Sequence, residues 1–539
     1  MRPPSSRPVV LLAAAVIALA GCAKRETPVE AGLRTRTLYL GNSQEPGDLD
    51  PQIITAYTEN TIVLALFEGL TAVDETTGKS VPATAESWKV SDDGLTYTFI
   101  LRPSARWSNG DPLTAADFVW SFRRVLSPAL ASEYSYMLWP IRNGRAFTEG
   151  KLTDFAQVGV RAPDEHTLVV TLEAPCPWLL ALTANPSWFP VHRATLEKFG
   201  AADKKGTRWT RPENMVSNGP FVLKEWTPDS RIVTEANPRY WDAARNRLAG
   251  VVFSPIASGA TEEKSFRAGQ LHITYGLAPD KIVAYRAESP QLLRADPFLE
   301  TFFLSFNTAK PPLDNAKLRQ ALSLAIDRTA LARDVLHGSV AAAAEFTPPD
   351  TAGYTATPAL KTDFAAARQL LTEAGYPGGR GLPPLELQVK ADDLHKIAAE
   401  TIQQMWQREL GVTVTLANME QKTWLQRLNT HDFQISTTRW IGDYVDANTF
   451  LEMWITGGGN NWTGWSEPRY DALVAEAGRT LDPAKRHDLQ RQAEAILLER
   501  LPIIPVFHPA RVYLADATVQ NWAPSLLGTH RYQFIELKR

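Results

Sequence analysis

The segment that decides the fold runs from Pro82 to Phe122 and reads PATAESWKVSDDGLTYTFILRPSARWSNGDPLTAADFVWSF. Within it, residues 95–101 alternate large apolar side chains with threonines, which predicts a half-buried strand. Thr114 and Asp117 then have the spacing of a capping box, with Asp in place of the usual Glu. Apolar side chains follow on one helical face, at Phe118, Phe122 and Val125. The segment therefore predicts a strand followed by a capped helix.

Strand and helix patterns alternate through the rest of the chain. Order is expected to begin near Thr37, after a polar tether of residues 22–36. Asp314 is a candidate cap for another helix, and Gly338 is a candidate stop. Further helices are predicted at residues 363–374, 394–410 and 483–500, and further strands at 166–172, 412–416 and 503–507. Because no repeat of fixed length appears, the pattern favours α/β or α+β layers over a solenoid or propeller.

The N-terminus has the pattern of an export signal. Arg2 and Arg7 precede an apolar run that ends in Leu-Ala-Gly-Cys at Cys22. Such a pattern is typical of a cleaved signal peptide, here residues 1–21, and the apolar run is too short to span a bilayer. The last four residues resemble the lipobox of bacterial lipoproteins, which implies a lipid anchor on Cys22. A signal peptide in which Cys22 is incidental is the alternative.

Composition narrows the possible classes. Cys176 is the one other cysteine among 539 residues, so an exported, lipidated chain has no internal disulfide and its stability must come from a hydrophobic core. The formal net charge is −3 and no basic block occurs, which gives no indication of a nucleic-acid partner. No later stretch approaches the ~18 uninterrupted apolar residues of a membrane-spanning helix.

Catalytic and metal-binding motifs are absent from the sequence. The nine histidines never stand at short metal-ligand spacing, and Cys-x-x-Cys, Gly-x-Ser-x-Gly and Walker-type loops do not occur. We therefore predict no enzyme, no metal and no cofactor. A secreted hydrolase that uses two carboxylates stays open as an alternative, because such a pair leaves no local motif.

The segment from Pro82 to Phe122 resembles the signature of the peptide-binding class (bacterial family 5) of extracellular solute-binding proteins, the receptors of peptide ABC importers. Within that class, the oligopeptide-binding and murein-peptide-binding lipoproteins are the most similar. The resemblance continues through nearly the whole mature chain, in Asn218–Phe221, Asn237–Trp241, Leu318–Leu322, Phe346–Pro349 and Trp440–Tyr444.

This resemblance implies a two-lobed, periplasmic-binding-protein-like α/β fold of type II, with an extra third domain. Lobe I would be discontinuous and would combine residues 37–67, 192–299 and 511–539. Residues 68–191 would form the extra domain II, and residues 300–510 would form lobe II. A ligand would be enclosed between the two lobes.

The resemblance also implies a set of ligand-binding residues. A receptor for many peptides must hold the groups that they share, which are a backbone, an ammonium group and a carboxylate. Asp443 corresponds to the family's ammonium-binding aspartate, and a loop-capping role is the alternative. Trp440, Tyr134 and Tyr57 fall on positions that line the ligand channel, and core packing is the alternative for each of them.

Several positions depart from the family pattern around this aspartate. Ile441 and Glu300 replace the two cysteines of a family disulfide. Arg439 stands where a glycine is expected, and the family's arginine two residues earlier is Thr437. We expect Arg439 to supply a cation inside the cleft that favours ligands with an acidic group, such as murein-type peptides. A solvated Arg439 outside the cleft is the alternative.

Two histidines and a glycine complete the expected ligand-binding positions. His395 and His337 occupy basic positions that such receptors use for the peptide carboxylate. Because histidine titrates near neutral pH, carboxylate recognition could then depend on pH. Gly276 is the remaining residue that we expect to bind the ligand.

The predicted function is that of a monomeric, membrane-anchored lipoprotein receptor in the cell envelope, either in the periplasm or on the outer cell surface. It would enclose oligopeptides between its lobes and deliver them to a membrane permease that works with a partner ATPase. The same fold with another ligand, such as a nickel complex, haem or an oligosaccharide, is the alternative.

Overall fold

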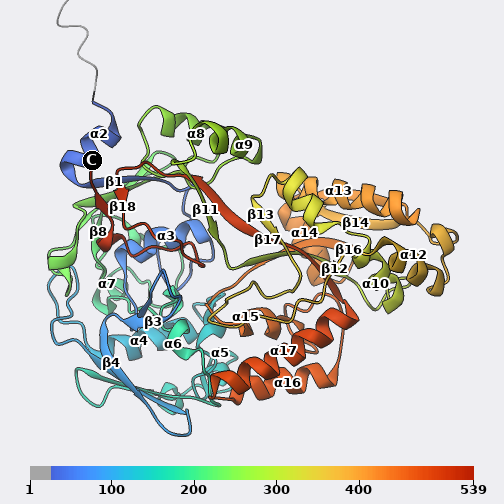
Figure 1. The fold of residues 1–539 in the computed structure, drawn as a ribbon. Helices are drawn as coiled ribbons and strands as arrows, with labels where there is room; N and C mark the ends of the chain where they lie inside the picture. Colours follow the sequence, from blue (N-terminus) through green and yellow to red (C-terminus); the bar gives the residue numbers. More distant parts are fainter. Residues whose placement is uncertain (1–25) are drawn as a thin grey trace, which may run out of the picture.

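The structure, a computed structural model, describes residues 26–539 (Figure 1). The predicted signal peptide of residues 1–21 and the predicted lipid anchor at Cys22 lie outside the described residues. The fold is mixed α/β and two-lobed, as predicted. Within residues 26–539, no helix is both long and apolar enough to cross a membrane.

The first helix, α2 (Pro28–Thr35), corrects the expectation that residues 22–36 are a tether and that order begins near Thr37. Thr27 and Glu30 form a capping box, in which the side chain of each accepts the backbone N–H of the other at 2.8 and 3.2 Å. Pro28 occupies the first helical position, where a missing N–H costs nothing. Because Val29 N–H also donates to the Gly269 carbonyl at 3.0 Å, the helix is tied to the folded chain.

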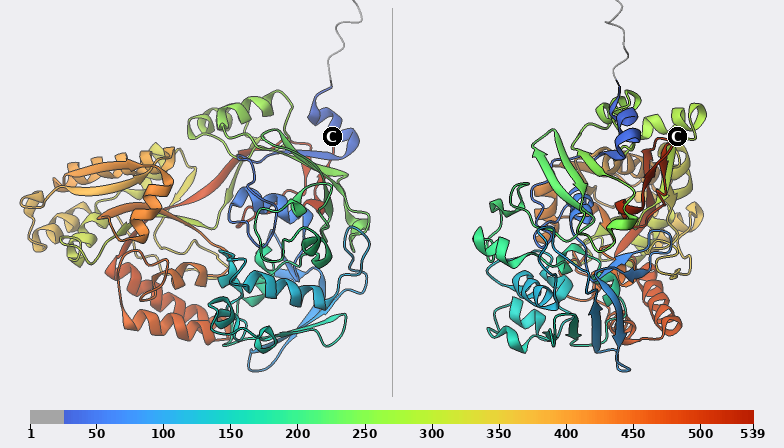
Figure 2. Two further views of the ribbon diagram at one scale, coloured as in Figure 1. Left: turned by 180° about the vertical axis from the view of Figure 1, so that it is seen from behind. Right: turned by 90° about the vertical axis from the view of Figure 1, so that its left-hand side faces the viewer.

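A four-stranded sheet forms the centre of the first lobe. Its strand order is β1 (Thr37–Gly41), β10 (Gly250–Ser254), β9 (Arg231–Ala236) and β8 (Phe221–Thr227). The hydrophobic core around it draws on residues 38–67, 189–273 and 513–535. Its helices are α3 (Tyr57–Leu66), α7 (Arg193–Lys198), α8 (Gly259–Arg267) and α9 (Pro279–Glu288). The C-terminus lies beside α2 at the edge of this lobe (Figures 1 and 2).

A second sheet lies in the part of the chain that follows α3. It consists of β4 (Ala85–Val90), β5 (Thr96–Leu101), β7 (Thr167–Thr171) and β6 (Val160–Arg161), and β2 (Thr71–Val73) pairs with β3 (Ser80–Pro82). The strands predicted at residues 95–101 and 166–172 are thereby confirmed as β5 and β7. Helix α4 (Ala115–Leu126) begins where the capping box predicts, and Asp117 Oδ2 accepts the Thr114 N–H at 2.8 Å. Two short helices complete this part, α5 (Gly144–Thr148) and α6 (Leu179–Leu182).

The second lobe contains a seven-stranded mixed sheet. Its order is β11 (Leu293–Pro297), β17 (Ile503–Leu514), β12 (Glu300–Phe306), β16 (Ile435–Ile441), β14 (Leu385–Lys390) and β15 (Val414–Met419), with β13 (Val340–Ala342) paired to β17. Strand β14 runs parallel to both of its neighbours, β15 and β16. The helices of this lobe are α10 (Ala316–Leu324), α11 (Arg328–Ala330), α12 (Phe364–Glu373), α13 (Asp393–Leu410), α14 (Gln421–Asn429), α15 (Asn448–Leu451), α16 (Pro468–Arg479) and α17 (Pro483–Arg500).

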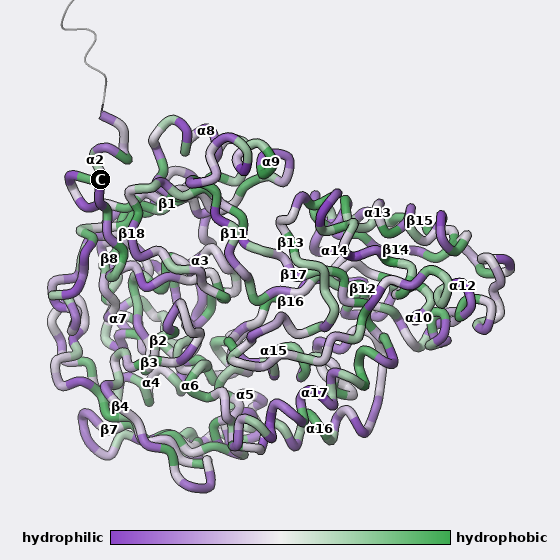
Figure 3. The backbone as a smooth tube through the Cα atoms, in the orientation of Figure 1, coloured by the Kyte–Doolittle hydropathy of each residue, from purple (hydrophilic) through white to green (hydrophobic). Residues whose placement is uncertain are grey.

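The predicted helices at residues 363–374, 394–410 and 483–500 are confirmed as α12, α13 and α17, each within one residue at either end. In Figure 3 the tube along α16 and α17 changes between hydrophobic and hydrophilic every few residues, and the buried residues of α17 include the polar Arg486, Gln490 and Glu494. The cap of α10 is Asn315 and not Asp314, and its side chain accepts the Lys317 N–H at 3.0 Å. Helix α10 ends at Leu324, so Gly338 is not its stop.

Strand β17 is longer than the predicted strand of residues 503–507, and it continues to Leu514. Its first half pairs with β12 and its second half with β11. Strands β11 and β12 follow each other closely along the chain and form one crossing segment. Strand β17 forms the other, and the two hydrogen-bonded segments pass side by side from one lobe to the other. Such a crossing is suited to hinge bending. The predicted domain limits near residues 299 and 510 fall on these segments and stay predictions.

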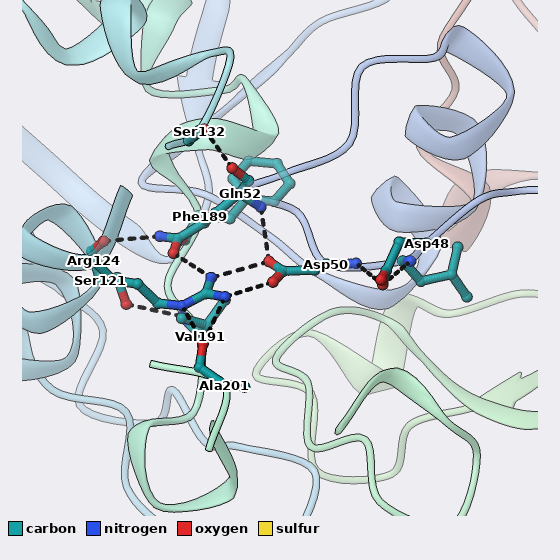
Figure 4. A network of polar contacts seen from close by, with 10 residues as sticks. Asp48, Asp50, Gln52, Ser121, Arg124, Ser132, Phe189, Val191 and Ala201 are labelled. Carbon is teal, nitrogen blue, oxygen red and sulfur yellow. Dashed lines mark hydrogen bonds and ion pairs between the residues drawn. The ribbon is translucent and has the colours of Figure 1, made fainter. Parts of the chain in front are cut away.

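A buried ion pair ties helix α4 to the first lobe (Figure 4). Arg124 Nη2 lies 2.7 Å from Asp50 Oδ2, and each side chain is 1% exposed. Arg124 also donates to Gln52 Oε1 at 2.8 Å and to the Ala201 carbonyl at 3.1 Å. Gln52 in turn donates to the Ser121 carbonyl of α4 at 2.9 Å. Every charge in the pair therefore has a hydrogen-bonding partner, as burial requires.

Candidate ligand-binding site

A cavity lies between the two lobes and the part of the chain that contains the second sheet. Its volume of about 500 Å³ is typical of a small-ligand site. Its walls come from helix α3 and the residues before it, from residues 134–136 and 181–187, from the ends of β14 and β16, and from residues 525–533. Seven of the predicted ligand-binding residues line it: Tyr57, Tyr134, His395, Arg439, Trp440, Ile441 and Asp443.

Two predicted residues are not among those that line the cavity. The carbonyl of His337 accepts a hydrogen bond from Arg286 Nη1 at 3.0 Å, and His337 has a positive φ of 51° in the turn before β13. Gly276 lies after Tyr275, and its N–H is 3.4 Å from Glu262 Oε2. The structure therefore does not bring these two positions together with the other seven.

Asp443 is positioned by the turn that follows strand β16. Gly442 is required in this turn, because a Cβ there would lie 2.6 Å from Leu299 Cδ2 and 3.0 Å from Thr449 Cγ2. The Asp443 N–H donates to Thr449 Oγ1 at 3.2 Å, and this bond fixes the backbone. The side chain accepts a hydrogen bond from the Tyr136 hydroxyl at 2.9 Å. No Lys, Arg or His of residues 26–539 forms an ion pair with this carboxylate.

Burial raises the pKa of Asp443 to about 6, although hydrogen bonds from Tyr136 and Tyr134 act in the opposite direction. The two tyrosine rings are stacked, with centroids 5.6 Å apart and an angle of 30° between their planes. A carboxylate that is held by neutral hydroxyls inside a cavity retains its attraction for a cation. The Asp443 side chain is therefore suited to bind the ammonium group of a ligand.

Arg439 lines the cavity, and its charge is paired within the protein; the expected preference for acidic ligands stays a prediction. Its Nε donates to Glu300 Oε1, and the Glu300 side chain is 1% exposed. The cause lies in the register, since Glu300 on β12 stands opposite Ile441 and diagonally across from Arg439 on β16. An ion pair thus occupies the place where the family pattern has a disulfide, and Glu300 neutralises the charge of Arg439.

His395 lines the cavity from the first turn of α13, where it is 1% exposed. Its Nδ1 lies 2.8 Å from Thr437 Oγ1. His395 and Thr437 both stand at positions where the family pattern has a basic residue, and the two side chains contact each other. Burial lowers the pKa of His395 to about 3, which keeps the ring neutral at ordinary pH. The expected pH dependence of carboxylate recognition therefore does not come from His395.

Aromatic side chains form much of the remaining wall. The Tyr57 hydroxyl donates to the Gly528 carbonyl and accepts from Arg511 Nη1 at 2.8 Å, so its polar group is already engaged by the protein. Trp440 Nε1 is buried and has no hydrogen-bond partner in the described chain, and the same holds for Asn60 Oδ1 on α3. One unpaired donor and one unpaired acceptor thus belong to residues that line the cavity, although the two atoms themselves are buried.

Among the lining residues that were not predicted from the sequence are Asn60, Tyr136, Lys390 and Trp424. Tyr136 lies two residues after the predicted Tyr134, in the short 3₁₀ helix Ser135–Leu138. Trp424 lies on α14, and its Nε1 donates to Ser436 Oγ on β16 at 3.1 Å. Lys390 ends β14 next to β16, and the carboxyl ends of parallel strands are the usual place for ligands in α/β sheets.

The chain is similar to known proteins in sequence and in fold. The family model described as Bacterial extracellular solute-binding proteins, family 5 Middle, matches residues 79–462. The chain is 36% identical over 498 residues to the probable deoxycholate-binding periplasmic protein YgiS of Escherichia coli, covering 91% of each chain. It is 33% identical over 532 residues to the periplasmic oligopeptide-binding protein OppA of Salmonella typhimurium, covering 96% of this chain and 95% of the relative.

Two solved structures show the same fold. The murein tripeptide-binding protein MppA of Escherichia coli superposes with a TM-score of 0.80 at 33% identity, covering 93% of this chain and 98% of the other. OppA of Haemophilus influenzae, solved in complex with the peptide RPPGFSPFR, superposes with a TM-score of 0.79 at 29% identity, covering 94% of this chain and 99% of the other.

Proposed function

This chain belongs to family 5 of the bacterial extracellular solute-binding proteins, and from that membership we propose that it is the peptide receptor of an ABC importer. It binds an oligopeptide between its two lobes and presents the closed complex to a membrane permease. The family consists of substrate-binding proteins and not of enzymes, and in our proposal the chain returns its ligand intact.

The observation that carries the proposal is the Asp443 carboxylate in the cavity wall. It accepts a hydrogen bond from the Tyr136 hydroxyl at 2.9 Å and has no cationic partner among residues 26–539. A peptide supplies the missing cation as its N-terminal ammonium.

Closure of the lobes is part of the proposal. Tyr136 reaches Asp443 from the opposite side of the cavity, and Trp178 stacks on Tyr444 with ring centroids 6.1 Å apart and an angle of 7°. Contacts of this kind exist when the two sides are close together. A ligand that contacts both sides therefore favours the closed form, since a ligand shifts an equilibrium only by its differential affinity for the two states.

We also propose the cellular setting. The chain acts in the cell envelope, as a monomer in the periplasm or on the outer cell surface, and Cys22 carries the lipid anchor. The periplasmic relatives support the compartment. The Leu-Ala-Gly-Cys sequence that ends at Cys22 supports the anchor. Two acyl chains on such an anchor would hold the receptor stably at a bilayer, whereas one chain gives marginal binding.

Mass spectrometry of the ligand that co-purifies with the protein tests the proposal. We expect a mixture of short peptides with free N-termini after the protein is denatured to release its ligand. Incubating the purified protein with these peptides should leave them unchanged. Release of a single non-peptide compound would contradict peptide binding, and peptide cleavage would favour the two-carboxylate hydrolase instead.

A second candidate keeps the fold and changes the ligand. YgiS of Escherichia coli, which is 36% identical to this chain, is a probable deoxycholate-binding protein, and a bile acid carries a carboxylate but no ammonium group. An ionised Asp443 would repel such a ligand. Titration of the protein with deoxycholate and with trialanine separates the two possibilities. Binding of trialanine would support the peptide receptor. Binding of deoxycholate alone would support a bile-acid receptor.

Ligand affinity is expected to depend on pH through Asp443, whose pKa burial raises to about 6. The carboxylate must be ionised to pair with an ammonium group, so affinity should fall as the pH is lowered from 7 towards 5, with a slope approaching tenfold per pH unit. Calorimetry with trialanine at several pH values measures this. The Asp443→Asn variant serves as the control, because its affinity should be low and flat over the same range.

Glu452 also titrates in this range, since burial raises its pKa to about 7. Its carboxylate accepts hydrogen bonds from the Tyr444 hydroxyl at 3.0 Å and from Asn448 Nδ2 at 2.7 Å. A pH dependence that persists in Asp443→Asn would therefore point to Glu452 and contradict the role given to Asp443.

A further inference from the structure

The charged side chains of the cavity wall differ in how many hydrogen bonds and ion pairs they already form with other residues of the protein. Six charged side chains line the cavity: Glu68, Glu75, Lys390, Arg439, Asp443 and Arg531. Glu68 accepts hydrogen bonds from Tyr240, from Trp241 Nε1 at 2.7 Å and from Thr84 Oγ1 at 3.0 Å. Glu75 accepts from His530 Nδ1 at 2.9 Å and from the Arg531 backbone N–H at 2.5 Å. Arg439 is paired with Glu300.

Two cations of the cavity wall are therefore candidates for a ligand anion. Arg531 stands near two carboxylates, since Glu75 accepts its backbone N–H and its charge helps to lower the pKa of Glu68 against the effect of burial. The guanidinium also lies over the Phe534 ring, 4.5 Å from its centroid. An anion at Arg531 would meet the negative charges of these two glutamates, which leaves Lys390 as the better candidate.

Lys390 is the last residue of β14 and is 26% exposed. It forms a long ion pair with Asp392, whose Oδ2 is 3.7 Å from Nζ, a distance too long for a hydrogen bond. That carboxylate has another role, because Asp392 caps helix α13 by accepting the His395 N–H at 3.0 Å. The Lys390 ammonium group also lies over the Trp424 ring, with Nζ 6.0 Å from the ring centroid. Among the described residues, no oxygen accepts a hydrogen bond from the Lys390 ammonium group.

Lys390 ends strand β14, and Asp443 lies two residues beyond the end of the neighbouring strand β16, in the same chain direction. β14 and β16 are parallel and pair at Gln388 and Ser436, so Lys390 stands two residues beyond this pair and Asp443 seven residues beyond it. The difference of five residues corresponds to at most about 17 Å of extended chain. A peptide of a few residues spans such a distance, with its ammonium group at Asp443 and a carboxylate at Lys390.

We propose that Lys390 binds a carboxylate of the ligand and makes the receptor select peptides that carry negative charge at that position. The inference rests on the proposed function and refines its ligand class. It transfers to Lys390 the role that the sequence alone suggests for Arg439. The carboxylate can be the C-terminus of a short peptide or an acidic side chain, and the chemistry at Lys390 is the same in both cases.

The test compares Lys390→Gln with Lys396→Gln by calorimetry. Lys396 is exposed on α13 and does not line the cavity, so the control removes the same charge from the same region. The probes are Ala-Glu-Ala and Ala-Gln-Ala, each with a free and with an amidated C-terminus. Charge-assisted hydrogen bonds contribute enough that Lys390→Gln should lose at least about tenfold in affinity for the probes whose carboxylate it binds.

The pattern of losses identifies the source of the carboxylate. Loss for both Ala-Glu-Ala probes alone assigns an acidic side chain, and loss for both free acids alone assigns the C-terminus. Ala-Gln-Ala amide, which has no carboxylate, should bind Lys390→Gln and the wild-type protein equally. Unchanged affinity for all four probes, or an equal loss for all four, would overturn the inference and leave the peptide receptor intact. If the wild-type protein binds none of the four, the proposed function fails and the inference fails with it.

Discussion

The Asp443→Ala variant is expected to lose about 2–5 kcal/mol of binding free energy for a peptide with a free N-terminus, which is roughly 30-fold or more in affinity. The reason is that the ligand ammonium group would be desolvated in the cavity without a counter-charge. The tyrosine hydroxyls that now contact the carboxylate cannot replace that charge. Calorimetry with trialanine measures the loss, and Asp443→Asn should behave similarly because it keeps the shape and removes the charge.

A matched control is available at the other end of the same strand. Asp432 precedes β16 and its side chain is 72% exposed, so Asp432→Ala should leave peptide affinity unchanged. The ligand supplies a second control, since an N-acetylated trialanine lacks the ammonium group. It should bind the wild-type protein weakly and should be insensitive to Asp443→Asn. Equal losses for free and acetylated peptides would show that Asp443 supports the fold of the site and does not bind the ammonium group.

The Arg124→Ala variant is expected to lower the free energy of unfolding by about 3–5 kcal/mol. Arg124 and Asp50 are both 1% exposed, so removing the guanidinium leaves a buried carboxylate without its charge partner. The hydrogen bonds to Gln52 and to the Ala201 carbonyl are lost at the same time. Urea unfolding, followed by tryptophan fluorescence, should show a midpoint at a clearly lower urea concentration than for the wild-type protein.

The neighbouring residue provides the comparison for this variant. Arg123 is exposed on the same helix, and Arg123→Ala should change stability by no more than about 0.5 kcal/mol. If Arg124→Ala unfolds at the same urea concentration as Arg123→Ala, the ion pair contributes nothing to holding α4 on the first lobe.

Local signals in the sequence are sufficient for much of the secondary structure. Helix α17 begins at Pro483 and ends at Arg500 as predicted, and the cap residue Asp482 and the proline at the first helical position both agree with its start. The capping box at Thr114 likewise locates the start of α4. The same kind of signal exists at Thr27 and Glu30, but it falls in a short polar segment whose packing on the first lobe depends on distant residues.

Features that depend on pairing between distant strands were not predictable in this way. The second half of β17 is a strand because β11 lies beside it, about 200 residues away in the sequence. The same applies to the cavity. Asp443 is identified by a motif, whereas the partner that neutralises Arg439 depends on the register of β12 against β16. Lys390 has no motif at all and becomes visible only when β14 is placed next to β16.

The pairing of Glu300 with Arg439 has a consequence for how the molecule matures. Residues 26–539 contain one thiol, that of Cys176, and it is buried. Burial raises the pKa of this thiol well above the usual value, so it reacts poorly. No covalent cross-link has to form between β12 and β16 before this lobe is complete. The folded part of the chain therefore reaches its native state without an oxidising catalyst, and a reducing environment leaves it unaltered.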